Sequence, residues 1–316
     1  MYQSDCRLAP CRSLAVETLD FKPAGLEDKH WMDRIIRLED SRSADFCFTS
    51  IFIWDEIFHQ HVTHIGERLL VRLTYQDAPF YAYPVGDGDL EPAICALCQD
   101  AAVFHVPLKL RGVTEKHRQE LEEVFPGQFE FTPDCYTFDY VYEVEKMATL
   151  AGKKLHAKRN HINRFIEANP SWVYEPITLE TLPQCMDMVR EWVQEHPNQG
   201  GYASEMYALN RAFSNFEALG LEGGLLRTEG KVIAFTMGEP LNSDTYIIHF
   251  EKAFPGIQGA YPMINREFAR HIQRSHPQLQ YINREDDMGI EFLKKAKRSY
   301  YPAFLLEKYT AALREV

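Results

Sequence analysis

The sequence lacks an apolar run long enough to cross a membrane. A spanning helix needs about 18 or more consecutive apolar residues, and no segment of the 316 residues approaches this. Residues 1–20 carry charges where a secretory signal peptide has an apolar centre. We therefore expect a cytoplasmic protein without a membrane-spanning segment.

Cysteine is scarce and irregularly placed. The seven cysteines are scattered and odd in number, which does not indicate a disulfide framework. Cys95 and Cys98 form one Cys-x-x-Cys pair in the apolar stretch 91–102, without a second pair. We expect buried thiols there rather than a metal site. His59, His61 and His64 alternate as in a strand and lack a supporting series of acids, so no metal is predicted.

Basic residues are outnumbered, 34 to 46, which gives a formal net charge of −12. Such a chain is not expected to coat nucleic acid, and we expect no DNA partner. The cations nevertheless gather in GKKLHAKRNHINRF (152–165), where Lys154, Lys158 and His161 are spaced to share one helix face. That face indicates an anionic ligand, most simply phosphate, or else a solvated helix. A second basic cluster comprises Lys294, Lys295, Lys297 and Arg298.

A Gly-x-Ser-x-Gly motif is also missing, which argues against a hydrolase with a serine nucleophile. What the chain does contain is a repeat at a constant offset of 153 residues. Phe21 matches Tyr174, Pro23 matches Pro176, and the pairs continue from 26–27 with 179–180 to 35–37 with 188–190. Each copy reads as a strand, a turn and an amphipathic helix. We expect two related domains, 1–147 and 148–316.

The order of expected elements is mixed α/β. The second half reads as basic helix 153–168, strand 172–176, helices 179–195 and 204–219, hairpin 223–241, strand 244–252, helix 262–275, strand 278–283, helix 288–297 and strand 303–309. The first half begins with strand 17–22 and helix 27–39 and continues with a hairpin at 67–86. Aromatic segments 46–58 and 136–142 are expected in the core and in interdomain packing.

This order resembles the GCN5-related N-acetyltransferase (GNAT) fold over residues 172–309, and more faintly over 19–145. The stretches KKLHAKRNHINRF and INREDDMGIEFLKKAKRSYYPAF are similar to a bacterial family related to the C-terminal catalytic domain of phosphatidylglycerol lysyltransferase. FemX-type aminoacyltransferases are a more distant likeness. The resemblance implies two tandem GNAT-like domains, each a mixed, mostly antiparallel sheet flanked by helices.

The resemblance also implies an acyl- or aminoacyltransferase whose active site lies in the C-terminal half. The donor would be coenzyme A, as acyl-CoA, or alternatively aminoacyl-tRNA. The acceptor would be an amine or hydroxyl of a small molecule, lipid or peptide. A non-catalytic module that keeps the phosphate-binding loop is the alternative function.

The expected donor site is the loop FPGIQGAYP (254–262) between strand 245–253 and helix 262–275. Glycines permit close backbone approach, and a helix start offers N–H groups and a positive dipole end to an anion. Gln258-Gly259-Ala260 has the residues of the acetyltransferase loop pattern without its spacing. The predicted donor-binding residues are Phe250, Gly256, Ile257, Gln258, Gly259, Ala260, Tyr261, Asn283, Lys154 and Lys158.

The thiolate-protonating tyrosine of the acetyltransferases has no match. Laid on their pattern, Asp286 takes the place of an Asn and Leu293 that of the Tyr. Tyr300 and Tyr301 lie seven or eight residues too late unless folding returns one of them. This difference favours aminoacyl transfer, in which the leaving group is a ribose hydroxyl.

Acids at the end of strand 278–283 are the expected catalytic groups, since sites in α/β proteins collect at strand ends. One of them could accept a proton from the attacking amine or orient a substrate ammonium. Glu251 and His249 share a face of the preceding strand. Alternatively, Asp286 and Asp287 cap helix 288–297, and His249 is a core histidine. The predicted catalytic residues are Glu251, Glu285, Asp286, Asp287 and Tyr300.

Overall fold

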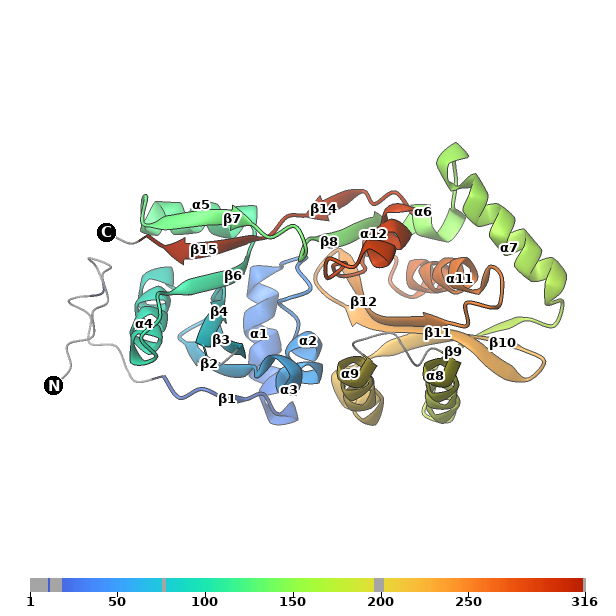
Figure 1. Ribbon diagram of the computed structural model, residues 1–316, viewed down its shortest axis with the longest axis horizontal. Coiled ribbons are helices and arrows are strands. Elements are labelled where there is room, and N and C mark those ends of the chain that lie inside the picture. Colours follow the sequence, from blue (N-terminus) through green and yellow to red (C-terminus); the bar gives the residue numbers. More distant parts are fainter. Residues whose placement is uncertain (1–10, 12–18, 76–77, 196–201, 315–316) are drawn as a thin grey trace. The chain divides into compact units, whose positions relative to one another are not determined.

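The computed structural model describes residues 11, 19–75, 78–195, 202–314, and these divide into two compact units. Unit 1 contains residues up to 138 together with 306–316, and unit 2 contains residues 139–305 (Figure 1). In the part of the chain described, no helix is both long and apolar enough to span a membrane. Predicted strand 17–22 lies partly outside the described residues.

Unit 1 is built on a sheet with the order β1-β2-β3-β4-β6-β15-β7, and β5 pairs with β3. Its strands are β1 (Lys22–Pro23), β2 (His61–Ile65), β3 (Arg68–Tyr75), β4 (Ala78–Ala82), β5 (Val85–Gly86), β6 (Lys109–Val113), β7 (Phe129–Pro133) and β15 (Tyr309–Leu313). Its helices are η2 (Leu26–Asp28), α1 (Lys29–Glu39), α2 (Phe48–Ile53), α3 (Asp55–Phe58), α4 (Leu90–Val103) and α5 (Glu115–Val124).

Unit 2 is built on a sheet with the order β14-β8-β13-β12-β11-β10-β9. Its strands are β8 (Asp139–Glu143), β9 (Val173–Pro176), β10 (Glu222–Thr228), β11 (Lys231–Pro240), β12 (Thr245–Ala253), β13 (Tyr281–Asn283) and β14 (Phe304–Leu306). Its helices are α6 (Val144–Thr149), η3 (Lys153–Leu155), α7 (His156–Ala168), α8 (Leu182–Glu195), α9 (Tyr202–Ser214), α10 (Phe216–Leu219), α11 (Ala260–Ser275) and α12 (Glu291–Arg298).

The two sheets repeat one plan, which confirms the predicted fold class. Each sheet contains a parallel pair of neighbouring strands among the described residues: β4 with β6 in unit 1 and β12 with β13 in unit 2. Helices α1 and α8 begin at Lys29 and Leu182, which is the predicted offset of 153. Each sheet also includes a strand distant in sequence from its neighbours: β15 between β6 and β7, and β8 between β13 and β14.

Because of where strands β8 and β15 pair, the boundary between the two units differs from the predicted one. Strand β8 and helix α6 belong to unit 2, because β8 pairs with β13 over residues 141–143. Strand β15 belongs to unit 1, because it pairs with both β6 and β7. The boundary between the units therefore lies at 138/139 instead of 147/148, and the C-terminal strand returns to unit 1.

One cysteine expectation was wrong. Cys95, on α4, forms a disulfide with Cys11, so it is not a free thiol. Cys98, one turn further along α4, is buried as expected. A stable disulfide is uncommon in a reducing compartment, so the cysteine pattern no longer supports the cytoplasmic prediction.

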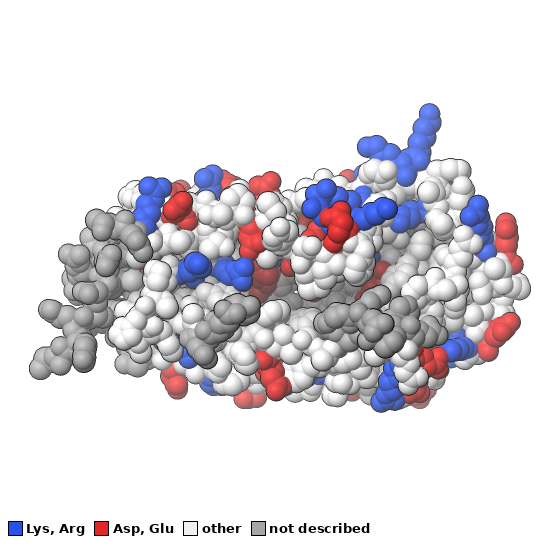
Figure 2. Space-filling view, viewed as in Figure 1, with Lys and Arg blue, Asp and Glu red and all other residues white. Residues whose placement is uncertain are grey.

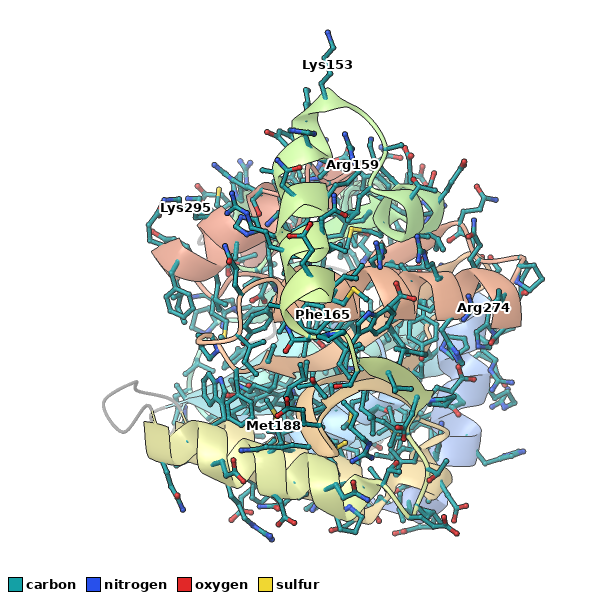
Figure 3. The ribbon with its side chains drawn as sticks, turned by 90° about the vertical axis from the view of Figure 1, so that its right-hand side faces the viewer. Lys153, Arg159, Phe165, Met188, Arg274 and Lys295 are labelled. Carbon is teal, nitrogen blue, oxygen red and sulfur yellow. A yellow bond between two sulfur atoms is a disulfide. The ribbon has the colours of Figure 1, made fainter. Side chains whose placement is uncertain are left out.

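The sheet of unit 2 has helix α11 on one face and α8 on the other (Figure 1). Apolar residues at helical spacing explain the packing of α11, since Ile264, Phe268 and Ile272 are all buried. Helix α7 also has apolar residues on one face, and of these Ile162 and Phe165 are buried. Phe165 lies toward the end of α7 that packs on α11, and Lys153 precedes the exposed start (Figure 3).

Candidate active site

The parallel pairing of β12 and β13 ends early and leaves their following residues apart. The last paired residues are Ile247 and Asn283, although β12 continues to Ala253. Polar side chains from the two strand ends bridge this gap. Glu251 of β12 reaches Arg284, and His249 reaches Glu285. The prediction that His249 and Glu251 share a face of the strand is wrong, because the pairing of β11 with β12 shifts register between Met237 and Gly238 and the extra residue is His249. Glu251 contacts Asn265 of α11, whereas His249 contacts Glu239 on the other face of the sheet.

Glu251 and Arg284 form an ion pair with 3.0 Å between Oε1 of Glu251 and Nη2 of Arg284. Their side chains are only 12% and 13% exposed, so both charges are largely withdrawn from water. Asn265 of α11 donates a further hydrogen bond to the same carboxylate oxygen at 2.9 Å. These two donors fix the orientation of Glu251.

Arg284 is the central cation of the site. Its guanidinium carbon lies 5.6 Å from the ring centroid of Tyr142 and 5.2 Å from that of Tyr300. Burial is the largest influence and lowers the pKa of Arg284, but the charge of Glu251 and the neighbouring tyrosines together raise it, so it stays above its usual value. The other terminal nitrogen, Nη1, is buried without a hydrogen-bond partner among the described residues. An unpaired buried donor of this kind is rare and is available to a ligand.

Helix α7 adds a second cation from a different part of the chain. Lys158 Nζ lies 3.9 Å from the ring centroid of Tyr300. Burial and the neighbouring charge of Arg284 lower the pKa of Lys158 to about 8. Folding has thus returned Tyr300, which the sequence placed too late, to the side of Arg284. The Tyr300 ring is buried, and burial raises the pKa of its hydroxyl well above the usual range.

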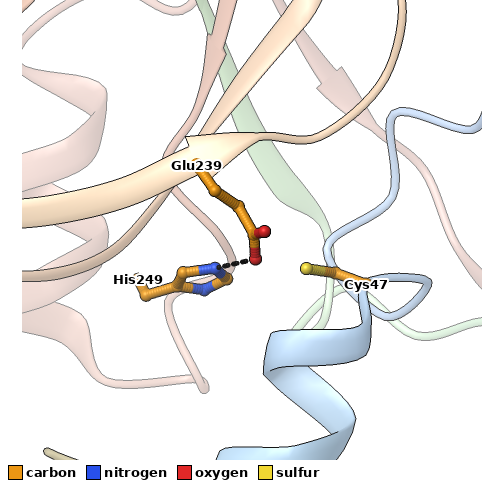
Figure 4. A group of neighbouring side chains, drawn as sticks. All are labelled: Cys47, Glu239 and His249. Carbon is orange, nitrogen blue, oxygen red and sulfur yellow. Dashed lines mark hydrogen bonds and ion pairs between the residues drawn. The ribbon is translucent and has the colours of Figure 1, made fainter. Parts of the chain in front are cut away.

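His249 is buried between two carboxylates. Its Nδ1 lies 3.1 Å from Glu285 Oε1. Its Nε2 lies 3.2 Å from Glu239 Oε1, the contact drawn in Figure 4. Both contacts can be hydrogen bonds only when the ring carries two protons or when one carboxyl group is protonated. The ring therefore links Glu239 of β11 to Glu285, which is 29% exposed.

Asp286 and Asp287 do not cap the following helix, which corrects that expectation. Helix α12 begins at Glu291 and its N-cap residue is Ile290. Instead, each aspartate accepts a hydrogen bond from the backbone N–H two residues later, at 2.9 Å, which makes a tight turn. Asp287 is buried and also accepts a 2.6 Å hydrogen bond from the Tyr140 hydroxyl. These contacts shape the turn that follows Arg284 and Glu285.

The loop 254–261 is closed on one side by α7. Gly259, with φ +85°, is the N-cap of α11, which starts two residues before the predicted position. A Cβ on Gly259 would lie 2.3 Å from the carbonyl oxygen of His161. The glycine is therefore needed for the packing of α7 on α11. Gly256 is exposed, and a Cβ there would meet nothing within 4 Å.

The remaining predicted donor-binding residues lie in several environments. Asn283 is fully buried and hydrogen-bonds Asp139 at 3.0 Å, and Phe250 is buried in β12. Tyr261 accepts a 2.8 Å hydrogen bond from Asn265 at its carbonyl oxygen. Ile257, Gln258 and Ala260 remain in the loop or at the start of α11, and only Gln258 among these three is exposed. Lys154 Nζ lies 5.2 Å from the ring centroid of Tyr301.

The second basic cluster is divided by the fold. Lys297 points inward, and its Nζ donates to the carbonyl oxygen of Arg284 at 2.6 Å and to that of Asp286. Lys295 and Arg298 are exposed on α12. Sequence reasoning missed Asn265 and Tyr142 as neighbours of Glu251 and Arg284. A helical polar residue on a mostly apolar face could have indicated Asn265, whereas nothing local indicated Tyr142.

Comparison with known proteins places this arrangement in a family. The chain matches an uncharacterized protein of Mycoplasmoides gallisepticum with 29% identity over 178 residues, which is 54% of each chain. The chain thus spans about half the length of that curated relative. A conserved protein of unknown function from Bacteroides thetaiotaomicron has a crystal structure with a TM-score of 0.88 and 41% identity. That match covers 94% of this chain and 100% of the other.

More distant structures share the fold. The C-terminal domain of a putative lysylphosphatidylglycerol synthetase from Agrobacterium fabrum has a TM-score of 0.65 at 14% identity, covering 92% of each chain. FemX has a TM-score of 0.57 at 6% identity, covering 92% of this chain and 97% of FemX. The family described as "Phosphatidylglycerol lysyltransferase, C-terminal" matches residues 36–312, which span both units. The chain belongs to this phosphatidylglycerol lysyltransferase C-terminal family and has its acyltransferase-like fold.

Proposed function

We propose that this chain transfers an aminoacyl group from aminoacyl-tRNA to an amine or hydroxyl acceptor, with its active site in unit 2. The observation that carries the proposal is the unpaired Nη1 of Arg284, which is buried beside Glu251 and close to Lys158. During acyl transfer, negative charge develops on the carbonyl oxygen. A hydrogen-bond donor that is already in position stabilises this charge without rearrangement.

In the proposed reaction, the acceptor nitrogen or oxygen forms a bond to the ester carbonyl carbon. The carbonyl oxygen takes up negative charge and accepts a hydrogen bond from Nη1 of Arg284, with the ammonium of Lys158 as a further cation. Glu251 and Asn265 hold the guanidinium in place. The bond to the ribose oxygen then breaks, and its electron pair leaves with that oxygen, which takes a proton.

The acceptor must lose a proton in the same reaction. Glu285 is the best placed group to take it, because it is partly exposed and hydrogen-bonded to His249. Glu251 is less suited to be the base, since its carboxylate is already bonded to two donors. Removal of a positioned base typically lowers a rate about 10²–10⁴-fold.

Two observations support tRNA over coenzyme A as the donor. Helix α7 lies against Gly259, at the helix start where the acetyltransferase loop would hold a pyrophosphate. The exposed cations Lys153 and Lys154 at the start of α7 suit an extended polyanion. If tRNA binds there, log affinity should fall linearly with log salt concentration, at a slope of about 0.7–0.9 per neutralised phosphate.

The test is transfer of a labelled aminoacyl group from tRNA to lipid, peptide and small amine acceptors. Measured per folded molecule, Arg284→Lys and Glu285→Gln should lower turnover by about 10²-fold or more while tRNA affinity persists. Asp286→Asn is the matched control and should keep turnover. Turnover of acyl-CoA instead of aminoacyl-tRNA would contradict the donor assignment. Binding of tRNA without any transfer would leave a non-catalytic binding module.

A further inference from the structure

A basic pocket lies on unit 2 at the start of α7. Its volume is about 440 Å³. One wall is the segment between α6 and α7, with Gly152, Lys153 and Lys154, and the other is the end of α12 with Arg298 and the segment after it with Tyr301. Lys and Arg side chains gather on the surface over α12 and the start of α7 (Figure 2). Lys146 also lines the pocket.

The charge of this pocket is unusual for the chain. It is lined by Lys146, Lys153, Lys154 and Arg298 and by no acidic residue, although the chain as a whole carries a net charge of −12. Among the described residues, none of these four cations makes an ion pair. Four uncompensated cations around one cavity repel one another, and an anionic ligand removes that repulsion.

The pocket walls are held in shape by specific contacts. Arg159 donates hydrogen bonds to the carbonyl oxygens of Leu150 and Gly152, which fixes the turn that carries Lys153. Leu150 and Gly152 both have positive φ, at 51° and 94°, so this turn has a defined, non-helical course. The site is therefore preorganised, which reduces the entropy lost on ligand binding.

Tyr301 gives the pocket an aromatic surface. It has φ +54°, a conformation that non-glycine residues rarely adopt, and its side chain is left 42% exposed. Lys154 Nζ lies 5.2 Å from its ring centroid. Exposed aromatic rings among cations are how proteins bind nucleotides without sequence preference, since the base stacks and the phosphate pairs.

We propose that this pocket binds a nucleotide, with its phosphate held by the four cations and its base stacked on Tyr301. The nucleotide is either free or the end of an RNA strand. In the RNA case the inference rests on the proposed function. Lys158 lies four residues after Lys154, and Tyr300 directly precedes Tyr301, so this inner pair connects the pocket to Arg284.

The test is calorimetric binding of three probes to the whole chain: adenosine 5′-monophosphate, ribose 5-phosphate and a short single-stranded RNA ending in CCA. Lys153→Gln combined with Arg298→Gln should weaken all three at least about tenfold. Tyr301→Asn tolerates a positive φ and should weaken adenosine monophosphate about 5- to 100-fold while leaving ribose 5-phosphate unchanged. Arg274→Gln, an exposed change at the far end of α11, is the control and should have no effect.

RNA that binds more than about tenfold tighter than adenosine monophosphate identifies an RNA end as the ligand, and equal affinities identify a free nucleotide. The inference is overturned if none of the three probes binds, if the charge variant binds them as the unmodified chain does, or if Tyr301→Asn changes no affinity. Arg284→Lys changes the proposed active site and none of the residues that line the pocket, so it separates this inference from the proposed function. If the unmodified chain shows no transfer, but the nucleotide still binds and its affinity depends on Tyr301, the pocket assignment is kept and the transferase proposal is rejected.

Discussion

Lys158 Nζ lies 3.9 Å from the ring centroid of Tyr300, and one helical turn earlier Lys154 Nζ lies 5.2 Å from that of Tyr301. Two lysines, one on η3 and one on α7, thus lie over two consecutive tyrosines. The outer pair lines the basic pocket, whereas the inner pair is withdrawn from water beside Arg284. The spacing of four residues therefore gives one exposed cation on η3 and one half-buried cation on α7.

Replacing Lys158 with Met should stabilise the protein at pH 7. Burial and Arg284 lower the pKa of Lys158 to about 8, from 10.5 in an unfolded chain, so the folded state disfavours the charged amine. The unfolded state binds more protons between these two values, and stability should rise with pH across that window. We expect a melting temperature about 2–4 °C higher at pH 7 for Lys158→Met, with a difference that shrinks toward pH 10.5.

The exposed Lys154→Met is the matched control for this experiment and should show no such pH-dependent difference. A constant gap between Lys158→Met and the unmodified protein at all pH values would contradict the assignment.

Gly259→Ala should destabilise the protein even without any donor present. The new Cβ would lie 2.3 Å from the carbonyl oxygen of His161, and φ at this position is +85°. Steric strain of this kind costs about 1–3 kcal/mol or more. Gly256→Ala is the control, because a Cβ there meets open space, and it should change stability by less than about 0.5 kcal/mol. Equal stability of the two variants in urea denaturation would refute the packing role of Gly259.

Asp287→Ala should cost more stability than Asp286→Ala. Asp287 is buried and bonded to the Tyr140 hydroxyl, so its loss leaves a buried donor unpaired and costs about 1–3 kcal/mol. Asp286 bonds the exposed backbone N–H of Met288, and its loss should cost less than about 1 kcal/mol. Tyr140→Phe should not add fully to Asp287→Ala in a double-mutant cycle. Full additivity would show that the two side chains do not interact.

Glu39→Gln should reduce the stability of unit 1 in a pH-dependent way. Burial raises the pKa of Glu39, but His117 and Lys116, at 3.1 and 2.8 Å, outweigh burial and lower it to about 2. The ionised carboxylate therefore contributes stability above about pH 4.5, and this contribution is lost as pH falls toward 2. We expect the variant to lose about 1–3 kcal/mol at pH 7 and to approach the unmodified protein near pH 2–3. A pH-independent loss would point to packing alone.

Reduction of the Cys11–Cys95 disulfide should lower the melting temperature. The bond closes a loop with a sequence separation of 84, and chain-entropy models assign about 4–5 kcal/mol to a loop of that size. Cys11→Ser should reproduce the effect of a reducing agent and should not respond to it further. An intact mass that is the same before and after reduction would show that the bond is absent.

The sequence by itself determined the elements and their repetition. Helix and strand periodicity, turn residues and the offset of 153 are local patterns, and they predicted the fold class. Strict alternation along β12 failed at His249, where the pairing with β11 shifts register. The sequence likewise predicted the basic helix α7 and the strand that carries Glu251, because each of these elements depends on residues that are close in sequence.

Tertiary structure alone decided which of these residues meet. Arg284 is surrounded by Tyr142 of β8, Lys158 of α7 and Tyr300. Tyr142 reaches it because β8 joins the sheet beside β13, and Lys158 reaches it because α7 packs against Gly259. Such contacts depend on strand order and helix packing, which periodicity does not encode. The assignment of Lys297 to the interior and of Lys153 to the pocket has the same cause, since burial depends on what covers a helix face and not on the sequence of that face.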